Sequence, residues 1–411
     1  MTKIAIIGSG ISGLVCAYLL SRKHDVTLFE SNDYLGGHTH THDIKVKGQD
    51  IRVDTGFIVY NDRSYPNFIK LLDELGCEGI PTEMSFSMKD EASNLEYNGH
   101  TINTLFAQRR NILRPSFWRL VRDILRFNKE AKEISAENNS TLEEYLVDGH
   151  YSKEFRNQYL LPMAAAIWST GGDRVGQFPL RSFVDFFRNH GLLELKNRPQ
   201  WYVVKGGSNS YVKAMEGKLG KCVLNANVTS IRRSAEGVNI CVNDEWHEFD
   251  EVIIAAHSNE ALSMLEQASQ EEQEVLGNIA FSKNIASLHT DIRQLPRRPL
   301  AWASWNYQND LDRPDMATLT YNMNILQKIK SEDQILVTLN DNNQINPNLL
   351  IKQIEYYHPL YNHDTLAAQQ RFDDISGKQN THYCGAYWYY GFHEDGVKSA
   401  LRVCKQFGIE L

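Results

Sequence analysis

The sequence predicts an α/β protein made of two interleaved domains, and three observations lead to this fold class. Residues 3–7 form an apolar run typical of a buried strand, and a glycine-rich turn and a helix-forming stretch at 14–20 follow it. Comparable glycine motifs beside apolar runs return in the middle and at the end of the chain. The length of 411 residues is enough for two or three domains with sizeable cores.

The composition is that of an ordinary globular protein, with 42% hydrophobic and 23% charged residues. A net charge of -8 argues against nucleic acid as a partner of the whole surface. The six cysteines form no CxxC pair, which favours reduced thiols in a cytoplasmic protein over a disulfide framework or a zinc site. The uncharged run at 4–20 resembles a signal peptide, but its three glycines and the lack of a cleavage site favour a strand followed by a helix.

The first motif is a GxGxxG turn, which predicts a dinucleotide-binding site in a Rossmann-like unit. Gly8 permits the tight turn, Gly10 lets the backbone approach a pyrophosphate, and Gly13 lets the helix pack closely on the strand. Ser12 lies in the same turn, at the start of a helix whose free N–H groups attract an anion. A second strand at 25–29 ends at Glu30, where an acid accepts hydrogen bonds from ribose hydroxyls.

Two further motifs connect the chain to a known family. Gly36 and Gly37 follow the second strand, and Gly56 closes the segment 53–57. With these motifs the chain resembles the superfamily of flavin-containing amine oxidases and phytoene desaturases. The resemblance implies FAD, bound without a covalent link, rather than free NAD. That superfamily commonly has Arg after the Gly-Gly pair, whereas this chain has His38, so we expect backbone contacts there but no charge pairing with the phosphates.

The resemblance extends to the middle and the end of the chain. The segments around Gly385 and at 391–397 are similar to the closing flavin motif, in which N–H groups at a helix start face the flavin pyrimidine edge. This assigns FAD contacts to Gly385, His393, Gly396 and Val397. Residues 204–208 and 225–228 are similar to the middle FAD segment, and the resemblance places Val228 near the adenine at the end of a strand. The sequence segments GGHTHT, SWNY and GFHEDG are similar to those of bacterial flavin oxidoreductases associated with modified fatty-acid synthesis, of the cyclopropane or furan type.

The order of the motifs predicts how the two domains share the chain. Residues 1–62, 200–262 and 378–411 carry the nucleotide-binding signals and form the expected FAD-binding domain. Residues 63–199 and 263–377 form the expected α+β substrate domain, as in the amine oxidase-like two-domain fold. No second GxGxxG-plus-acid unit follows Glu30, so we expect no separate NAD(P)H domain.

The candidate catalytic residues are those that would surround the flavin, because the cofactor itself carries the hydride chemistry and no protein base is required. Phe392 matches the position of an aromatic residue that amine oxidases place beside the flavin. Trp168, Trp305 and Tyr387 come from aromatic-rich segments suited to cavity walls, although core packing explains such residues as well. Many amine oxidases carry a lysine that holds a water at flavin N5, and the aligned position here is Asn284.

Three histidines alternate after the Gly-Gly pair, at His38, His40 and His42. On an extended strand they would share one face, as metal ligands do. No carboxylate or cysteine belongs to this alternation, so we predict no metal site. His393 and Glu394 invite an acid–base role, but their place in the closing motif favours a helix start.

A basic amphipathic helix is the remaining signal. Residues 107–132 contain eight Lys or Arg residues against Asp123 and Glu130, and Pro115 suits a first helical turn. Arg119, Arg122, Arg126 and Lys129 follow at steps of three and four residues and form one stripe. Such a helix, around residues 114–132, either packs on the core with a solvated basic face or rests on an anionic membrane.

Three functions follow from these observations. The first is an FAD-dependent oxidoreductase that takes a hydride from an apolar small molecule or lipid, in particular a fatty-acyl chain. The second is a flavin amine oxidase or dehydrogenase. The third is a flavoprotein partner of a lipid-modifying enzyme, without turnover of its own. We expect a cytoplasmic protein, with peripheral contact at the inner membrane face if the basic helix binds lipid.

Overall fold

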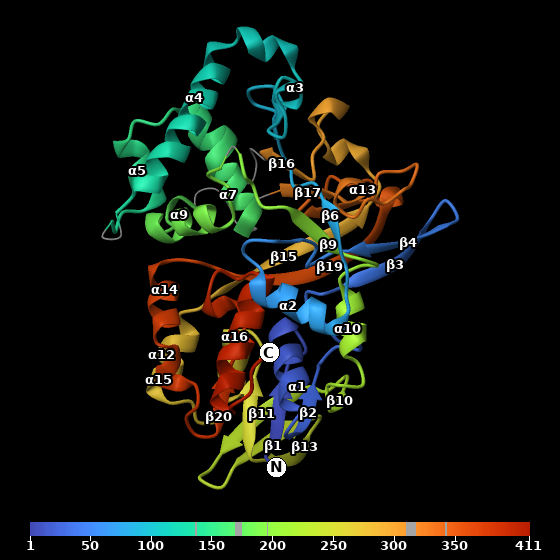
Figure 1. The fold of residues 1–411 in the computed structure, drawn as a ribbon, viewed down its shortest axis with the longest axis vertical. Helices are drawn as coiled ribbons and strands as arrows, with labels where there is room; N and C mark the ends of the chain where they lie inside the picture. The colour runs from blue at the N-terminus through green and yellow to red at the C-terminus, as the bar shows by residue number, and fades with distance from the viewer. Residues whose placement is uncertain (136–137, 169–174, 195, 310–317, 342) are drawn as a thin grey trace.

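The computed structural model describes residues 1–135, 138–168, 175–194, 196–309, 318–341 and 343–411. These residues form two halves stacked along the long axis of the molecule (Figure 1). The lower half carries both termini and a parallel sheet, and the upper half carries a larger mixed sheet and a group of helices. Short strands connect the halves.

A five-stranded parallel sheet lies at the centre of the lower half, in the order β10-β2-β1-β14-β20. Its strands come from the beginning, the middle and the end of the chain, which confirms the predicted α/β class and the interleaving of distant segments. The strands are short apolar runs covered on both faces, as is usual in parallel sheets. They are β1 (Lys3–Ile7), β2 (Asp25–Phe29), β10 (Lys221–Val223), β14 (Glu251–Ile254) and β20 (Thr381–Tyr383).

Helices α1 (Ile11–Leu20) and α16 (His393–Gln406) pack against each other beside this sheet. An antiparallel layer of β11 (Val228–Arg233), β12 (Val238–Val242) and β13 (Glu245–Phe249) lies near it. The prediction that Val228 ends a strand is wrong, because Val228 begins β11. Asn225 turns the chain before it, with φ at +51° and its N–H on the carbonyl of Asn32 at 3.0 Å. Helices α10 (Asn209–Met215) and α11 (Ser258–Met264) complete this region.

A seven-stranded mixed sheet forms the floor of the upper half, in the order β19-β15-β18-β17-β16-β7-β8. All neighbours are antiparallel except β16 and β7. The strands are β7 (Phe86–Asp90), β8 (Leu95–Asn98), β15 (Phe281–His289), β16 (Trp305–Asn309), β17 (Thr318–Asn322), β18 (Leu336–Leu339) and β19 (Leu350–Pro359).

Two small sheets lie where the halves meet. One pairs β3 (Thr41–Val46) with β4 (Gln49–Asp54), and the other has the order β5-β9-β6. Its strands are β5 (Tyr60–Asn61), β6 (Gly79–Thr82) and β9 (Trp201–Val204). Asp54 ties this region together, since its carboxylate accepts hydrogen bonds from the Ser208 N–H at 2.9 Å and from Gln327 Nε2 at 2.9 Å.

The helices of the upper half surround a second hydrophobic core. They are α3 (Ile102–Leu105), α4 (Pro115–Glu130), α5 (Leu142–Asp148), α6 (Lys153–Phe155), α7 (Leu161–Trp168) and α9 (Leu180–Asn189), with a short 3₁₀ turn, η1 (Arg109–Leu113). The predicted amphipathic helix is confirmed as α4: Pro115 stands in its first turn and Phe117, Leu120 and Phe127 are buried. No helix within the described ranges is both long and apolar enough to cross a bilayer.

Several helices from the predicted substrate segments pack on the lower core. Phe68 of α2 (Pro66–Leu75), Val275 of α12 (Gln270–Gly277) and Phe372 of α15 (Phe372–Ile375) all belong to the hydrophobic cluster around the parallel sheet. Helix α14 (His363–Gln370) lies beside α12 and α15, whereas α13 (Met323–Leu326) packs on the mixed sheet. The predicted domain boundaries lie at 62, 200, 262 and 378. We propose that they shift so that α2, α12 and α15 belong to the FAD-binding domain.

Candidate active site

The glycine turn between β1 and α1 shows three different environments for its three glycines. Gly8 has φ at +98°, and a Cβ there would lie 2.8 Å from the Ala255 carbonyl oxygen. A Cβ on Gly13 would lie 1.8 Å from the Gly8 carbonyl oxygen, so helix and strand touch as the motif predicts. A Cβ on Gly10 would meet nothing within 4 Å, and Gly10 lines a large cavity. The turn therefore leaves open space at the glycine predicted to face a pyrophosphate.

Glu30 holds this turn from the end of β2. Its buried carboxylate accepts hydrogen bonds from the Ser9 N–H at 2.9 Å and the Ser9 hydroxyl at 2.6 Å. It also accepts one from the Asn32 N–H at 2.8 Å. The Ala226 N–H donates to the Glu30 carbonyl at 2.8 Å, which brings the segment before Val228 to the same end of β2. The predicted ribose contact of Glu30 and adenine contact of Val228 thus belong to one corner of the fold.

The Gly-Gly segment folds back onto the glycine turn. Gly37 has φ at +57°, and a Cβ there would lie 3.1 Å from the Gly10 Cα. The Gly36 N–H donates to the Ser9 carbonyl at 3.1 Å. A Cβ on Gly56 would lie 2.2 Å from the His38 carbonyl oxygen, so only glycine fits there. The predicted positions Gly36, Gly37 and Gly56 therefore bring three backbone segments together at Gly10.

His38 lies on the cavity wall, and its Nε2 is buried without a hydrogen-bond partner among the described residues. Its ring lies 4.8 Å from Tyr356 and 5.5 Å from His358. Burial lowers the pKa of His38 well below its usual range, so the ring is neutral at pH 7. A neutral ring offers a hydrogen bond to a ligand but no charge pairing, as the replacement of Arg by His predicts.

The expectation that His38, His40 and His42 share one strand face is wrong. Strand β3 begins at Thr41, so only His42 lies in it, and His38 and His40 lie in the turn before it. His42 contacts His40 at 3.9 Å between ring centroids and bonds Thr55, while His38 faces the cavity. Within the described ranges, no group of three or more His, Cys, Asp or Glu side chains is arranged to hold a metal.

The starts of α1 and α16 meet at the same end of the cavity. The Ser12 hydroxyl donates to the Gly396 carbonyl at 2.9 Å, and a Cβ on Gly396 would lie 2.5 Å from Ile11. Gly385, Phe392 and His393 line the cavity here, whereas Val397 is buried in the core behind it. Because two helix N-termini point toward one place, this end favours negative charge, whether phosphate or a reduced flavin ring.

His393 begins α16, as its motif predicts, and is fixed on two sides. Its ring stacks on Phe57 with centroids 3.6 Å apart, and its Nε2 is 2.9 Å from the Tyr211 hydroxyl. Burial lowers the pKa of His393 to about 3. A side chain that remains neutral and immobile at physiological pH is suited to positioning a ligand and not to proton transfer.

Glu394 and Asp395 hold the surrounding helices. Glu394 accepts hydrogen bonds from the backbone N–H groups of Asn67 at 3.1 Å and Phe68 at 2.9 Å, at the start of α2. Asp395 accepts one from the Phe392 N–H at 2.9 Å, at the start of its own helix. Burial raises the pKa of Asp395 to about 7. These two caps were not predicted from the sequence, although Asp395 stands at the third position of its helix, a usual place for a capping acid.

Aromatic side chains line most of the cavity, which has a volume of about 440 Å³. Of the predicted wall residues, Phe392, Trp168, Trp305 and Tyr387 all line it. Phe186 of α9 joins two of them, with its ring 4.8 Å from Phe392 and 4.7 Å from Trp168. The lining residues that sequence reasoning missed include Met84, Ser85, Phe86, Tyr97, His100, Tyr159, Met163, Phe186, His190, Arg198, Tyr356, His358 and Tyr361.

Asn284 does not line the cavity, which corrects its prediction as a cavity residue. It is buried one layer behind, where its Nδ2 lies 3.0 Å from His358 Nδ1 and its Oδ1 accepts from Asn340 at 2.8 Å. His358, on the paired strand β19, takes the place at the cavity. Lys283 points to the opposite face of β15 and pairs with Glu355 at 2.5 Å. No lysine among the described lining residues corresponds to the one that holds water in amine oxidases.

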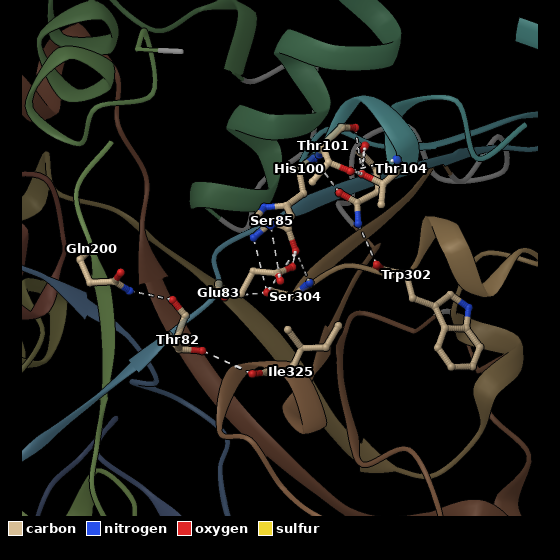
Figure 2. Close-up of polar contacts among 11 residues, drawn as sticks. Thr82, Glu83, Ser85, His100, Thr101, Thr104, Gln200, Trp302, Ser304 and Ile325 are labelled. Atoms are coloured by element: carbon tan, nitrogen blue, oxygen red, sulfur yellow. Dashed lines mark hydrogen bonds and ion pairs between the residues drawn. The ribbon is translucent and has the colours of Figure 1, made fainter. Parts of the chain in front are cut away.

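Figure 2 shows a polar cluster around Glu83, Ser85, His100 and Ser304, part of which lines the cavity. Ser85 and His100 line the cavity, and Glu83 lies behind them. The Ser85 hydroxyl donates to Glu83 Oε1 at 2.5 Å, and His100 Nε2 is 3.6 Å from Glu83 Oε2. Ser304 donates to the Glu83 carbonyl at 2.7 Å. The cluster joins the chain around 83–85 to the segment around 304 and gives the cavity one hydrophilic end.

The described cavity lining carries little charge, and that charge is positive. Arg198 is the one permanently charged side chain among the described lining residues, and none of them is Asp, Glu or Lys. Its Nε donates to the Glu194 carbonyl at 2.8 Å, and no described carboxylate pairs with it. Among the described lining residues, an anionic end group therefore finds a cationic partner, and a cation finds no carboxylate.

Comparison with known proteins agrees with this geometry. The family model described as "Flavin containing amine oxidoreductase" matches residues 11–290. A fatty acid isomerase of P. acnes has the same fold, with a TM-score of 0.70 and 16% identity over 99% of this chain and 98% of that one. A cyclohexylamine oxidase of Brevibacterium oxydans is equally similar, with a TM-score of 0.70 and 14% identity over 99% of both chains. A tryptophan 2-monooxygenase of Allorhizobium ampelinum is 56% identical over 45 residues, which are 10% of this chain and 6% of that protein.

We expect Gly10→Val to abolish retention of the flavin while leaving the fold intact. The backbone at Gly10, with φ at -59° and ψ at 174°, is open to any residue, and its Cβ meets no protein atom. The added methyl groups would occupy the space in which a phosphate approaches the backbone. The ratio of flavin to protein absorbance measures retention, and thermal unfolding of the apoprotein should change by less than about 1 kcal/mol. Gly277→Ala, where a Cβ also has room, is the matched control. Stoichiometric flavin in the Gly10 variant would contradict the placement.

A second expectation concerns pH. Because burial raises the pKa of Asp395 from 3.8 to about 7, the folded state retains a proton that the unfolded state loses. This contribution to stability is complete below the unfolded pKa and is lost as the pH rises from about 4 to about 7. Asp395→Asn should remove this decline, which amounts to up to about 4 kcal/mol, in urea unfolding across that range. Asp291→Asn is the contrasting control, since Arg293 holds the pKa of Asp291 below its usual range and the effect has the opposite sign. An unchanged pH slope in the Asp395 variant would refute the assignment.

Proposed function

The chain belongs to the family of flavin-containing amine oxidoreductases, and from this premise we propose that it is an FAD-dependent oxidoreductase that takes a hydride from a fatty-acyl or related lipid chain. The family and the fold establish a flavin-dependent oxidoreductase. The lipid substrate is our proposal, and the composition of the cavity lining carries it.

The residues around the cavity have separate roles in this function. Gly10, Gly37 and the starts of α1 and α16 would hold the pyrophosphate and the flavin, because open backbone and helix N-termini converge there. The bound flavin supplies the hydride acceptor. His38 and His393, both neutral through burial, would orient the cofactor by hydrogen bonding and stacking. The aromatic wall around Phe392 and Phe186 would exclude water and hold the reacting carbon.

The lining favours an apolar substrate with an anionic end over an amine. A buried ammonium group without a counter-charge is strongly disfavoured, and the described lining residues include no carboxylate. A carboxylate can meet Arg198, while an acyl chain can lie along the aromatic wall toward Phe392. The fatty acid isomerase of the same fold supports a lipid substrate. The amine oxidase of that fold keeps the amine as the second candidate.

The place of action follows from the substrate. We propose a cytoplasmic protein that meets its lipid at the inner membrane face, where a lipid-modifying enzyme would supply or consume the same chain.

Anaerobic reduction of the bound flavin tests the substrate class directly. We expect loss of flavin absorbance with fatty acids or an extract of membrane lipids, and none with mono- or polyamines. The same lipids added to a Gly10→Val preparation without flavin provide the control. Bleaching by amines alone would support an amine oxidase. Bleaching by neither class, with turnover only when a lipid-modifying enzyme is added, would support a flavoprotein partner.

Arg198 should set the affinity for the anionic end and not the rate of the chemical step. We expect Arg198→Gln to raise KM for a free fatty acid about tenfold with little change in kcat, since a charge-assisted hydrogen bond to the anionic end is lost equally in the bound substrate and in the transition state. Arg198→Lys, which keeps the charge, should recover part of the loss. The methyl ester of the same acid should be used equally by all three proteins. A parallel fall in kcat for acid and ester would show that Arg198 only supports the fold.

A further inference from the structure

We propose that the tip of the upper half, residues 102–118, docks on an anionic phospholipid surface. The tip consists of α3, the 3₁₀ turn η1 and the first turn of α4, and it lies at the end of the molecule opposite the N-terminus (Figure 1). The inference rests on the proposed function for its purpose, because a lipid substrate has to be collected from a membrane. Its support comes from the surface itself.

The tip exposes apolar side chains at an unusual density. Leu113 is 86% exposed and Ile102 is 80% exposed. Trp118 and Ile112 are each about half exposed, at 49% and 48%. Single exposed leucines are common on soluble proteins, but four large apolar side chains exposed within residues 102–118 are a concentration that indicates a partner. Trp118 is fixed in this position, since its Nε1 donates to the Ile112 carbonyl at 2.8 Å.

The same segment is strongly cationic, and no carboxylate among the described residues pairs with its first three arginines, Arg109, Arg110 and Arg114. Residues 97–122 contain five arginines and no Asp or Glu, in a chain with a net charge of -8. Arg109 bonds the Asn103 side chain at 2.7 Å, and Arg114 bonds the Ser93 carbonyl at 3.3 Å. Arg110 bonds the Asn94 carbonyl. All three acceptors are neutral, so within the described structure no negative charge offsets these three guanidinium groups.

The basic stripe predicted on α4 itself is less suited to binding an anionic membrane. Of the stripe, Arg119 pairs with Glu154 and Arg126 pairs with Glu130 at 3.4 Å; beyond the helix, Lys132 pairs with Glu194 at 3.1 Å. Arg122 contacts Asp123 at 3.3 Å. These pairs offset most of the positive charge, while the apolar face of α4 is buried. The structure thus moves the expected membrane contact from residues 114–132 to the turn that precedes the helix.

The tip is joined directly to the cavity. Gly99 and His100 line the cavity, and the next residue, Thr101, caps α3 by accepting from the Thr104 N–H at 3.1 Å. In return the Thr104 hydroxyl accepts from the Thr101 N–H at 2.9 Å (Figure 2). The tip therefore continues along the chain directly into a segment that lines the cavity.

A bilayer suits this surface better than a second copy of the chain or another protein. Exposed aliphatic side chains, a tryptophan and unpaired arginines are the features of proteins that lie in the headgroup region of anionic membranes. In a symmetric dimer the same arginines would face one another, which is unfavourable. The acidic remainder of the molecule would be repelled by the anionic leaflet, so only the tip would approach it.

Sedimentation of the holoprotein with vesicles tests the inference. We expect binding to phosphatidylcholine vesicles that contain phosphatidylglycerol, weakened by salt, and little binding to pure phosphatidylcholine. The triple variant R109Q/R110Q/R114Q should bind about a hundredfold more weakly, because each basic residue near an anionic leaflet contributes about fivefold. Leu113→Ser, at a side chain too exposed to affect folding, should lower binding about tenfold.

Two matched controls remove the same chemistry elsewhere. K23Q/K221Q/K378Q deletes three exposed charges at the opposite end of the molecule, and Ile292→Ser removes an apolar residue that is 53% exposed. Both should bind vesicles as the parent does. No binding by the parent, or equal losses in the controls and the tip variants, would overturn the inference. A tip variant that changes the mass in light scattering from dimer to monomer would also overturn it and assign the tip to a second copy.

The outcomes for docking and for function can be told apart. Flavin reduction by a fatty acid dispersed in detergent should be unchanged in the triple variant, since the tip lies outside the cavity lining. If vesicle binding fails while detergent-dispersed lipid still bleaches the flavin, docking is wrong and the proposed function stands. If the protein binds vesicles but no lipid bleaches the flavin, docking stands and the lipid substrate is wrong.

Discussion

The close contact between Gly13 and Gly8 is the constraint on which the site depends. Because a Cβ on Gly13 would lie 1.8 Å from the Gly8 carbonyl oxygen, α1 can begin only where these two glycines allow it to touch β1. The start of α1 then fixes the start of α16, through Ser12 and the contact between Gly396 and Ile11. Two helix N-termini and the bare backbone of Gly10 thereby meet at one end of one cavity. The anion-binding character of that end comes from backbone geometry, since no charged side chain is needed there.

Interleaving of the chain places the cavity where three hydrophobic clusters meet. Segments from the beginning and the end supply the glycine turns and α16, while β15, β19 and the helices α7 and α9 supply the opposite wall. Groups held between these clusters lose water. For this reason burial dominates their ionisation, keeping His38 and His393 neutral and raising the pKa of Asp395. The described cavity lining is thus nearly uncharged, which suits the hydride transfer proposed above.

The parts of this arrangement that depend on neighbouring residues could be predicted from the sequence. The glycine turn, the end of β2 at Glu30, the start of α16 at His393 and the start of α4 at Pro115 all have local causes, such as backbone freedom or helix capping. Long-range packing decides the rest. The register of β15 against β19 places His358 at the cavity and Asn284 behind it, and one residue of strand register reverses such an assignment. Arg198 and the caps made by Glu394 likewise depend on contacts between distant segments, for which the sequence contains no periodic signal.

The distribution of charge connects the two proposals physically. The chain is acidic as a whole, yet arginines without a carboxylate partner among the described residues occur at the tip and, as Arg198, in the cavity lining. An anionic amphiphile would meet arginines at the membrane surface, a single arginine in the cavity lining and two helix N-termini at the flavin end. Between these points the path is aromatic and aliphatic. A soluble amine would gain nothing along this path, because the arginines and the helix N-termini all repel a cation. The proposals of membrane docking and of a lipid substrate therefore rest on the same distribution of charge, although an experiment can contradict either one alone.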